Sequence, residues 1–385
     1  MPLLNKEIRL SLFLVTFLLA CTSTPQSGST AAPLGSSSFR DYSSSPGSLL
    51  ARLHVFRRGT LDGRQAQLSS TQGKAWGPGS ASKYYIDIDG SRRYFYATAP
   101  SGPLSSQWAT LIVLHGGGGS AESAMSTTRL AERSTGLNLN VVFPQAFGYG
   151  RMARWDTGLY GATNNKNNSD VHFLDRLTDL YGNGGKPVFL VGLSNGGMMV
   201  LNQLCNSSRS YQGAVVVAGG TSYQILNRCN PSARLPIAFV HGEQDSIVPF
   251  MGGEVHNRRF RLNDRSTVVP VVSHDQLVSF WRNRNSCSGS AYDRAPILSR
   301  YLNPDIRIRN YVMPVKQCLQ TLSIDIVNGD HGWPVDSSLS GNGQATRQYG
   351  WQFSGVVASR GRLDSGDFDT TGAVLALVGK WGASH

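Results

Sequence analysis

A serine between two glycines, placed where two apolar runs meet, is the most informative feature of this 385-residue chain. The segment Gly192-Leu193-Ser194-Asn195-Gly196 follows the apolar residues 187–191 and precedes the apolar residues 198–201. A buried strand, a sharp turn and a helix are the surroundings in which a serine hydroxyl is presented as a nucleophile. The flanking glycines allow the strained turn and the close backbone approach that this requires. The pattern therefore predicts nucleophilic catalysis by Ser194, although a G-x-S-x-G segment alone also occurs by chance.

Serine is a weak nucleophile, so a base must take its proton, and that base is usually a histidine oriented by a carboxylate. Among the eight histidines, His331 is the best candidate because it follows the predicted strand 322–327 on a loop that contains glycines. His241 begins a loop and is expected to have a structural role. The remaining histidines considered lie in predicted helices or in polar or terminal segments and are expected to be surface or core residues: His172, His274, His256 and His385.

The carboxylate should lie between the serine and the histidine if the chain follows the α/β-hydrolase order. Asp245 meets this condition, because it lies on the loop after the predicted strand 237–240. Glu243, two residues earlier on the same loop, is its competitor. Asp330, beside the predicted base, is expected to cap a loop or to lie on the rim of the site.

Two backbone N–H groups are needed to stabilise the oxyanion that forms when a serine attacks a carbonyl. The residue after the nucleophile, Asn195, should supply one of them. The other should come from the loop after the predicted strand 109–114, where four consecutive glycines, 116–119, leave the backbone amides accessible. A phosphate-binding loop is a poor alternative, because no Lys-Ser/Thr pair and no dinucleotide pattern follows.

These loops must be held by a sheet, and the sequence predicts one that is mostly parallel with helices on both faces. A hairpin with an Asp-Gly turn, 84–96, opens the domain. In a parallel sheet the active residues gather on the loops at the carboxyl ends of the strands. The further strands are expected at 109–114, 140–144, 188–191, 213–217, 237–240 and 322–327, and helices at 121–131, 170–180, from the Ser194 turn to 205, 274–284 and 370–381.

The amino-terminal part predicts export rather than folded structure. Residues 1–21 combine a short basic start with an apolar run too short to span a bilayer, and Cys21 follows a small residue as in a bacterial lipoprotein signal. Cys21 is therefore the expected lipidation site, with plain secretion as the alternative. Residues 22–50, rich in Ser, Thr, Gly and Pro, predict a disordered tether, residues 49–82 show no clear period, and residues 83–385 form the expected catalytic domain.

Charge and cysteine content set further limits. The formal net charge of +12 favours contact with anionic surfaces, but the basic residues are not interleaved with aromatic ones, so nucleic acid is not an expected partner. The clustered arginines are expected to form a solvated face: Arg258, Arg259, Arg261, Arg282, Arg284, Arg307 and Arg309. The sequence contains no C-x-x-C segment, so a metal or redox site built on cysteines is not expected. Apart from Cys21, four cysteines remain and allow three disulfide pairings, of which the sequential one closes short loops and is preferred: Cys205–Cys229 with Cys287–Cys318.

Taken together, these motifs resemble the esterase family of polyhydroxybutyrate depolymerases, which also holds feruloyl and acetylxylan esterases and LpqC-type lipoproteins. The resemblance covers about residues 84–381. The extended turn motif with its trailing Gly-Met-Met, combined with the His-Gly-Trp-Pro loop, is its most specific part. It rests on LHGGGGS at 114–120, SDVHFL at 169–174, GLSNGGMM at 192–199, HGEQDSIVP at 241–249 and HGWP at 331–334.

The resemblance implies an α/β-hydrolase fold and a triad of Ser194, Asp245 and His331. It also implies oxyanion donors at Gly117 and Asn195, and it supports the sequential disulfide pairing. Aromatic side chains that line an acyl or polymer groove are implied at Trp155 and Trp333. The chain departs from the family at His172, where a small residue is usual, and at Gly117, where some members carry a cysteine.

The expected activity is hydrolysis of carboxylic esters through an acyl-enzyme, without metal or cofactor. The substrate is expected to be short-chain polyester or its oligomers, and feruloyl or acetyl esters of plant polysaccharides are the alternative. A serine peptidase and a non-catalytic binding lipoprotein of the envelope are less favoured. The expected location is the bacterial cell envelope, through an N-terminal lipid anchor in the membrane, or the secreted fraction.

Overall fold

The computed structural model describes residues 81–98, 109–148, 153–159, 169–182, 184–230, 234–256, 270–287, 306–311, 318–334 and 368–383. The predicted export signal, the predicted lipidation site Cys21 and the predicted tether lie outside these ranges. Within them, none of the helices has the length and apolar character needed to cross a membrane.

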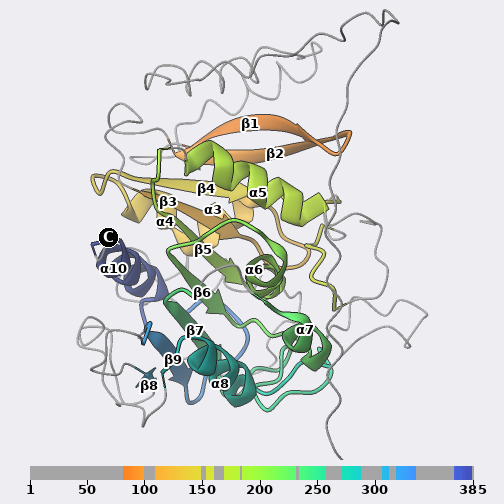
Figure 1. The fold of residues 1–385 in the computed structure, drawn as a ribbon, viewed down its shortest axis with the longest axis vertical. Helices are drawn as coiled ribbons and strands as arrows, with labels where there is room; N and C mark the ends of the chain where they lie inside the picture. The colour runs from red at the N-terminus through yellow and green to blue at the C-terminus, as the bar shows by residue number, and fades with distance from the viewer. Residues whose placement is uncertain are drawn as a thin grey trace, which may run out of the picture. The chain divides into compact units, whose positions relative to one another are not determined.

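A nine-stranded sheet organises the described part of the chain (Figure 1), in the order β1-β2-β4-β3-β5-β6-β7-β9-β8. The run from β4 to β9 in this order is parallel, whereas β1, β2 and β8 pair antiparallel at the two edges. The strands are β1 Ala81–Ile88, β2 Ser91–Thr98, β3 Ala109–Leu114, β4 Leu139–Pro144, β5 Val188–Leu193, β6 Gly213–Val217, β7 Ile237–Gly242, β8 Ile306–Tyr311 and β9 Thr321–Ile326.

The predicted hairpin is the β1–β2 pair. Asp89 and Gly90 both have positive φ, 49° and 76°, which is the backbone of a tight two-residue hairpin turn. This conformation matches the right-handed twist of the two strands and fixes their register, with Ile88 opposite Ser91.

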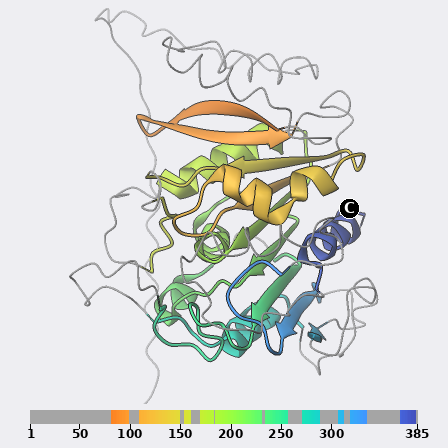
Figure 2. The ribbon, with the colours of Figure 1, turned by 180° about the vertical axis from the view of Figure 1, so that it is seen from behind.

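Helices cover both faces of the sheet, because alternate residues of each central strand point to opposite sides. In β3, Ile112 and Leu114 pack with α5, α6 and α8, whereas Leu111 and Val113 pack with α3, α4 and α10. The two helical layers can be followed from the two sides in Figure 1 and Figure 2. The helices are α3 Ala121–Thr128, α4 Leu130–Arg133, α5 Ser169–Tyr181, α6 Asn195–Asn206, α7 Tyr223–Arg228, α8 His274–Arg284 and α10 Thr370–Gly382.

This mostly parallel sheet with helices on both faces confirms the predicted α/β-hydrolase fold. The single helix expected at 121–131 is instead two, because Arg129 adopts a left-handed conformation with φ 51° between α3 and α4. The hydroxyl of Thr128 donates to the Ala124 carbonyl and accepts from the Leu130 N–H, so a side chain takes over backbone bonding at the break.

Two elements, α7 and β8, have no counterpart in the sequence-based expectation. Helix α7 has only six residues and is capped by the preceding Ser222, whose side chain accepts a hydrogen bond from the Ile225 N–H. Strand β8 places Arg307 and Arg309 two residues apart at the edge of the sheet, and Arg309 forms an ion pair of 2.9 Å with the buried Asp325. Part of the expected solvated basic face therefore pairs with specific carboxylates; positions 258–261 lie outside the described residues.

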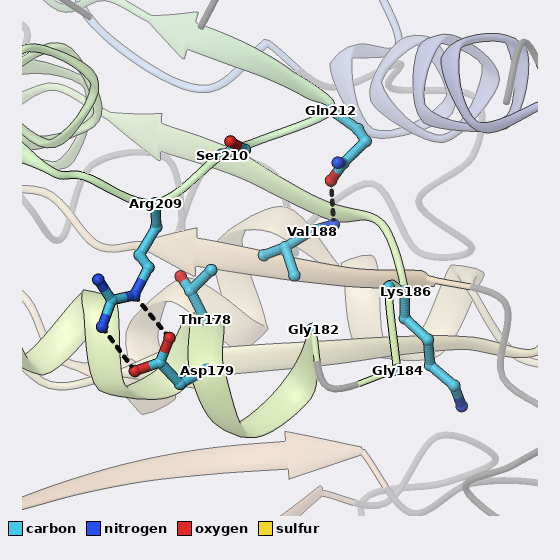
Figure 3. Close-up of a pocket in the computed structure, with 10 residues that line it drawn as sticks. Thr178, Asp179, Gly182, Gly184, Lys186, Val188, Arg209, Ser210 and Gln212 are labelled. Carbon is cyan, nitrogen blue, oxygen red and sulfur yellow. Dashed lines mark hydrogen bonds and ion pairs between the residues drawn. The ribbon is translucent and has the colours of Figure 1, made fainter. Parts of the chain in front are cut away.

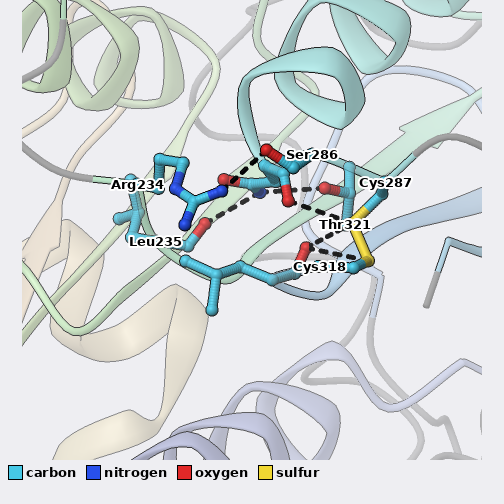
Figure 4. The surroundings of a disulfide bond; sticks show 8 residues. Arg234, Leu235, Ser286, Cys287, Cys318 and Thr321 are labelled. Atoms are coloured by element: carbon cyan, nitrogen blue, oxygen red, sulfur yellow. Dashed lines mark hydrogen bonds between the residues drawn. A yellow bond between two sulfur atoms is a disulfide. The ribbon is translucent and has the colours of Figure 1, made fainter. Parts of the chain in front are cut away.

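The preferred disulfide pairing is present in the structure. Cys205–Cys229 joins the end of α6 to the end of α7, and Cys287–Cys318 joins the segment after α8 to the approach to β9. Figure 4 shows this second bridge with Leu235 and Thr321 near it. The Asn285 amide donates to the Leu235 carbonyl and to the Thr321 hydroxyl, both at 2.9 Å. The bridge therefore reinforces the packing of α8 against β9.

A close backbone approach between α6 and the end of β3 yields a stability prediction. A Cβ atom at Gly196 would lie 2.3 Å from the Leu114 carbonyl oxygen and 2.6 Å from that of His115, whereas a Cβ at Gly379 in α10 would meet nothing within 4 Å. We expect Gly196→Ala to lower the free energy of unfolding by about 3 kcal/mol or more, because backbone atoms have to move. Gly379→Ala should raise it by up to about 1 kcal/mol, because alanine is the better helix former. Urea unfolding of both variants tests this, and equal stabilities would contradict the packing described here.

Candidate active site

The predicted nucleophile lies at a sharp turn between β5 and α6. Ser194 has φ 56° and ψ −120°, a backbone conformation that is unfavourable for a side chain other than glycine and that costs of order 1–3 kcal/mol. Its N–H donates to the Val217 carbonyl at 2.8 Å. The flanking glycines are required for steric reasons, since a Cβ at Gly192 would lie 2.2 Å from the Gly196 carbonyl oxygen.

The structure brings the three predicted catalytic residues into one hydrogen-bonded series. The Nε2 atom of His331 lies 2.9 Å from the Oγ atom of Ser194. The Nδ1 atom of the same ring lies 2.8 Å from Oδ2 of Asp245 and 3.0 Å from Oδ1. The three residues follow β5, β7 and β9, at the carboxyl ends of parallel strands. This arrangement can transfer the serine proton to an imidazole whose orientation the carboxylate holds.

The Asp245 carboxylate is buried and surrounded by donors. Its Oδ1 atom accepts from the N–H groups of Ile247 at 2.9 Å and Val248 at 2.7 Å, and its Oδ2 atom accepts from His241 at 3.1 Å. Burial raises the pKa of Asp245, but the charge of His331 and the hydrogen bonds of both histidines outweigh burial and hold that pKa well below its ordinary value. Asp245 therefore stays ionised across the physiological pH range.

The pKa of His331 is shifted in the opposite direction. Burial lowers the pKa of the imidazole, but the negative charge of Asp245, the hydrogen bond to it and the charge of Asp330 raise it above the ordinary value of 6.5. The raised pKa lets the His331 imidazole hold the serine proton once it has accepted it.

The other acids and histidines considered from the sequence have separate roles. Glu243, the competitor of Asp245, forms an ion pair of 2.7 Å with Arg307. Asp330 caps its loop, because its Oδ1 accepts from the N–H groups of Ser246 and His331. His241 has the expected structural position: its Nε2 lies between Asp245 and the Val248 carbonyl, so it must carry a proton.

The remaining histidines lie away from the series. His172 is exposed and pairs with Asp89 at 2.7 Å. His274 is buried beside Ser323, and burial lowers its pKa to about 4. His385 lies outside the described residues. Within the described ranges, no group of three or more His, Cys, Asp or Glu side chains could hold a metal ion.

The two predicted oxyanion donors lie next to each other. A Cβ atom at Gly117 would be 3.4 Å from the Cβ of Asn195, so the glycine loop after β3 passes directly beside the start of α6. Neither the Gly117 N–H nor the Asn195 N–H has a hydrogen-bond partner among the described residues. Two neighbouring backbone N–H groups that can both donate to one oxygen are what an oxyanion site requires.

Trp155 and Trp333 do not line an open groove in the structure, contrary to expectation. They expose 1% and 4% of their surface. The Trp333 indole N–H donates to Thr371 at 3.1 Å, and the Trp155 indole N–H donates to the His115 carbonyl at 2.9 Å. Both rings are buried and hydrogen-bonded inside the fold. In this structure each ring therefore contacts other residues of the protein and does not face an open groove.

A separate hollow of about 400 Å³ lies at the other end of the parallel strands, where β5 and β6 begin (Figure 3). Its walls include Lys186, Ser210 and the paired Arg209 and Asp179, whose two hydrogen bonds measure 2.6 and 2.9 Å. Because Ser194 lies at the carboxyl ends of the strands, this hollow is not part of the candidate active site.

Comparison with known proteins adds partial matches. Residues 172–278, which include Ser194 and Asp245 but not His331, match a family of phospholipases and carboxylesterases. A protein named "Putative esterase NocK" from Nocardia uniformis subsp. tsuyamanensis is 25% identical over 260 residues, which span 63% of this chain and 71% of that protein.

Two solved structures are also similar to the chain. An acetyl xylan esterase from Aspergillus awamori has a TM-score of 0.47 and 14% identity, over 65% of this chain and 94% of the other. Est1E from Butyrivibrio proteoclasticus has a TM-score of 0.33 and 14% identity, over 44% of this chain and 80% of the other.

The charges around His331 generate a pH prediction. If His331 is the base, it must be neutral to accept the serine proton, so kcat/KM should fall as the pH drops through its raised pKa, above 6.5. In Asp245→Asn the charge that raises this pKa is lost while burial, which lowers it, remains. The titration of the His331 ring, followed by NMR, should therefore move to lower pH.

Glu243→Gln is the matched control, since it neutralises the other carboxylate of the same loop, which pairs with Arg307. It should leave the His331 titration in place. An unchanged titration in Asp245→Asn, or an equal shift in Glu243→Gln, would contradict the assignment of Asp245 as the orienting acid.

Proposed function

We propose that this serine ester hydrolase uses Ser194, His331 and Asp245 to cleave short-chain polyester or its oligomers through an acyl-enzyme. The observation that carries the proposal is the hydrogen-bonded series from the Ser194 hydroxyl, at a strained turn, through His331 to Asp245. The polyester substrate is supported by the sequence resemblance to polyhydroxybutyrate depolymerases.

The reaction follows from the distances. The Nε2 atom of His331 accepts the Ser194 proton as the Oγ atom attacks the ester carbonyl, and the carbonyl oxygen becomes an oxyanion. The N–H groups of Gly117 and Asn195 donate to this oxygen, and each such donor is worth about 2.7–4 kcal/mol in enzymes where one was removed. His331 then returns its proton to the alcohol that leaves, and Ser194 remains acylated.

Water completes the cycle. His331, now neutral again, accepts a proton from a water molecule that attacks the acyl group. When the second tetrahedral intermediate collapses, the bond to Oγ breaks, His331 returns the proton to Oγ, and the acid leaves. Asp245 is ionised throughout and holds the Nδ1–H side of the ring, which stabilises the imidazolium in both steps. Every step uses side chains and backbone groups of this chain.

Substitution of the two reacting residues tests the activity. Ser194→Ala and His331→Ala should each lower kcat for p-nitrophenyl butyrate by at least about 10³-fold, because the members of such a triad act as a unit. Two matched controls should keep wild-type kcat. They are Ser210→Ala, at the hollow where β5 and β6 begin, and His172→Ala, at the exposed pair with Asp89. Full activity in either Ser194→Ala or His331→Ala would overturn the proposal.

The substrate class is tested with the wild-type protein. Hydroxybutyrate oligomers, methyl ferulate and acetylated xylan are compared by kcat/KM, and the proposal expects the oligomers to give the highest value. A higher value for methyl ferulate or acetylated xylan would assign the protein to plant polysaccharide esters instead.

For the location, we propose export to the bacterial envelope with lipidation of Cys21, supported by the basic and apolar start of the sequence and the small residue before the cysteine. The mass of the N-terminal peptide of the mature protein tests this. A peptide that begins at an acylated Cys21 is expected, and an unmodified Cys21 would contradict the anchor.

A further inference from the structure

The segment 153–155 lies between the two halves of the candidate oxyanion site. On one side, the Ala153 carbonyl accepts from the N–H of Gly118, in the glycine loop, at 2.7 Å. On the other, the Trp155 N–H donates to the side-chain oxygen of Asn195 at 2.7 Å, and the Asn195 amide donates back to the Trp155 carbonyl at 3.4 Å. This segment therefore bonds both to the loop that carries Gly117 and to the residue after Ser194.

The Trp155 side chain adds a third connection. Its indole N–H donates to the His115 carbonyl at 2.9 Å, at the start of the glycine loop, and its ring lies 5.2 Å from the His115 ring. The indole is 1% exposed, so water does not compete for this bond. Trp155 thus contacts the loop through its side chain and the start of α6 through its backbone.

His115, whose carbonyl accepts from the Trp155 indole, has both of its ring nitrogens hydrogen-bonded. The Nε2 atom of His115 accepts from the Ala146 N–H at 3.0 Å, so the proton of the neutral ring is on Nδ1, which donates to the Gly116 carbonyl at 2.7 Å. Burial lowers the pKa of His115 to about 4, and the ring is therefore neutral at the pH where an ester hydrolase works. The start of the glycine loop, which Trp155 contacts at His115, is therefore held by a neutral imidazole in a single tautomer.

We propose that Trp155 is a positioning residue that sets the distance between the N–H groups of Gly117 and Asn195. The inference rests on the proposed function, because it assigns Trp155 a part in the stabilisation of the oxyanion. Neither N–H group has a hydrogen-bond partner among the described residues, so its position depends on the surrounding contacts, which we call the frame: the bonds of segment 153–155 to the glycine loop and to Asn195. Trp155 supplies that frame through bonds to His115 and Asn195.

The physical consequence concerns the transition state. Oxyanion donors are effective because they are held in place before the reaction and need no reorganisation while charge develops. A displacement of about 1 Å by a change away from the reacting atoms can cost as much as 100-fold in rate. Loosening the frame should therefore lower kcat, with little effect on KM, because the lost interaction forms only in the transition state.

Three tryptophan substitutions separate positioning from packing. Trp155→Phe removes the indole N–H that bonds to His115 and keeps the backbone bonds to Asn195. Trp381→Phe removes a buried indole hydrogen bond of the same length, 2.9 Å to Gln320, in α10. Trp281→Phe removes a buried indole N–H, in α8, for which the described residues offer no hydrogen-bond partner. Steady-state kinetics with p-nitrophenyl butyrate and thermal unfolding are measured for all three.

We expect Trp155→Phe to lower kcat about tenfold or more, by analogy with small displacements of catalytic groups, with KM within about twofold of the wild type. Trp381→Phe should lose a similar amount of thermal stability and keep its kcat, and Trp281→Phe should change neither strongly. If kcat falls equally in Trp155→Phe and Trp381→Phe, or is retained in Trp155→Phe, the positioning role is overturned.

A second variant covers the case in which Trp155→Phe does not fold. Asn195→Ala removes both side-chain bonds to Trp155 and retains the backbone N–H that would serve the oxyanion. It should also lower kcat about tenfold or more with little change in KM, and wild-type kcat in a folded Asn195→Ala would overturn the inference. A wild-type protein that does not hydrolyse the ester would instead overturn the proposed function, so the two failures are distinguishable.

Discussion

The close approach of helix α6 to the end of strand β3 is the constraint on which the rest of the site depends. At Gly196 the helix passes so near the carbonyls of Leu114 and His115 that a single methyl group would collide with the backbone. This contact requires the chain to reverse sharply at Ser194, which accounts for its positive φ. It also brings the start of α6 beside the glycine loop. One steric condition therefore accounts for the turn that presents the Ser194 hydroxyl and for the position of Asn195 beside the glycine loop.

The pair of Asp245 and His331 depends on a second constraint, the hydrogen bonding of a buried carboxylate. A carboxylate without exposure to water remains ionised only where donors replace its hydration. Asp245 has such donors in the N–H groups of its own loop and in two histidines, whereas Glu243, two residues away, is paired with Arg307 at the edge of the sheet. The loop geometry thus decides which of two neighbouring acids can orient His331. The resulting negative charge raises the pKa of His331 against the effect of burial.

Much of this arrangement could be predicted from the sequence, because its central strands are continuous apolar runs and its functional loops carry glycines. The loops of Ser194, Asp245 and His331 follow from those runs together with the strand order of the fold. Helix α7 was missed because six residues do not complete two helical turns, and β8 because its arginines resemble an exposed basic segment. Trp155 was assigned to the substrate because nothing local shows that its N–H meets Asn195, 40 residues later.

Direct observation of the covalent intermediate tests the central claim, that Ser194 is the acylated nucleophile of an ester hydrolase. The wild-type protein is mixed with p-nitrophenyl butyrate, quenched in acid during turnover and analysed by intact mass and peptide mapping. The account predicts a population heavier by one butyryl group, with the modification on the peptide at Ser194 and absent from Ser194→Ala. Product formation with the butyryl group on another residue, or an equally acylated Ser194→Ala protein, would contradict it.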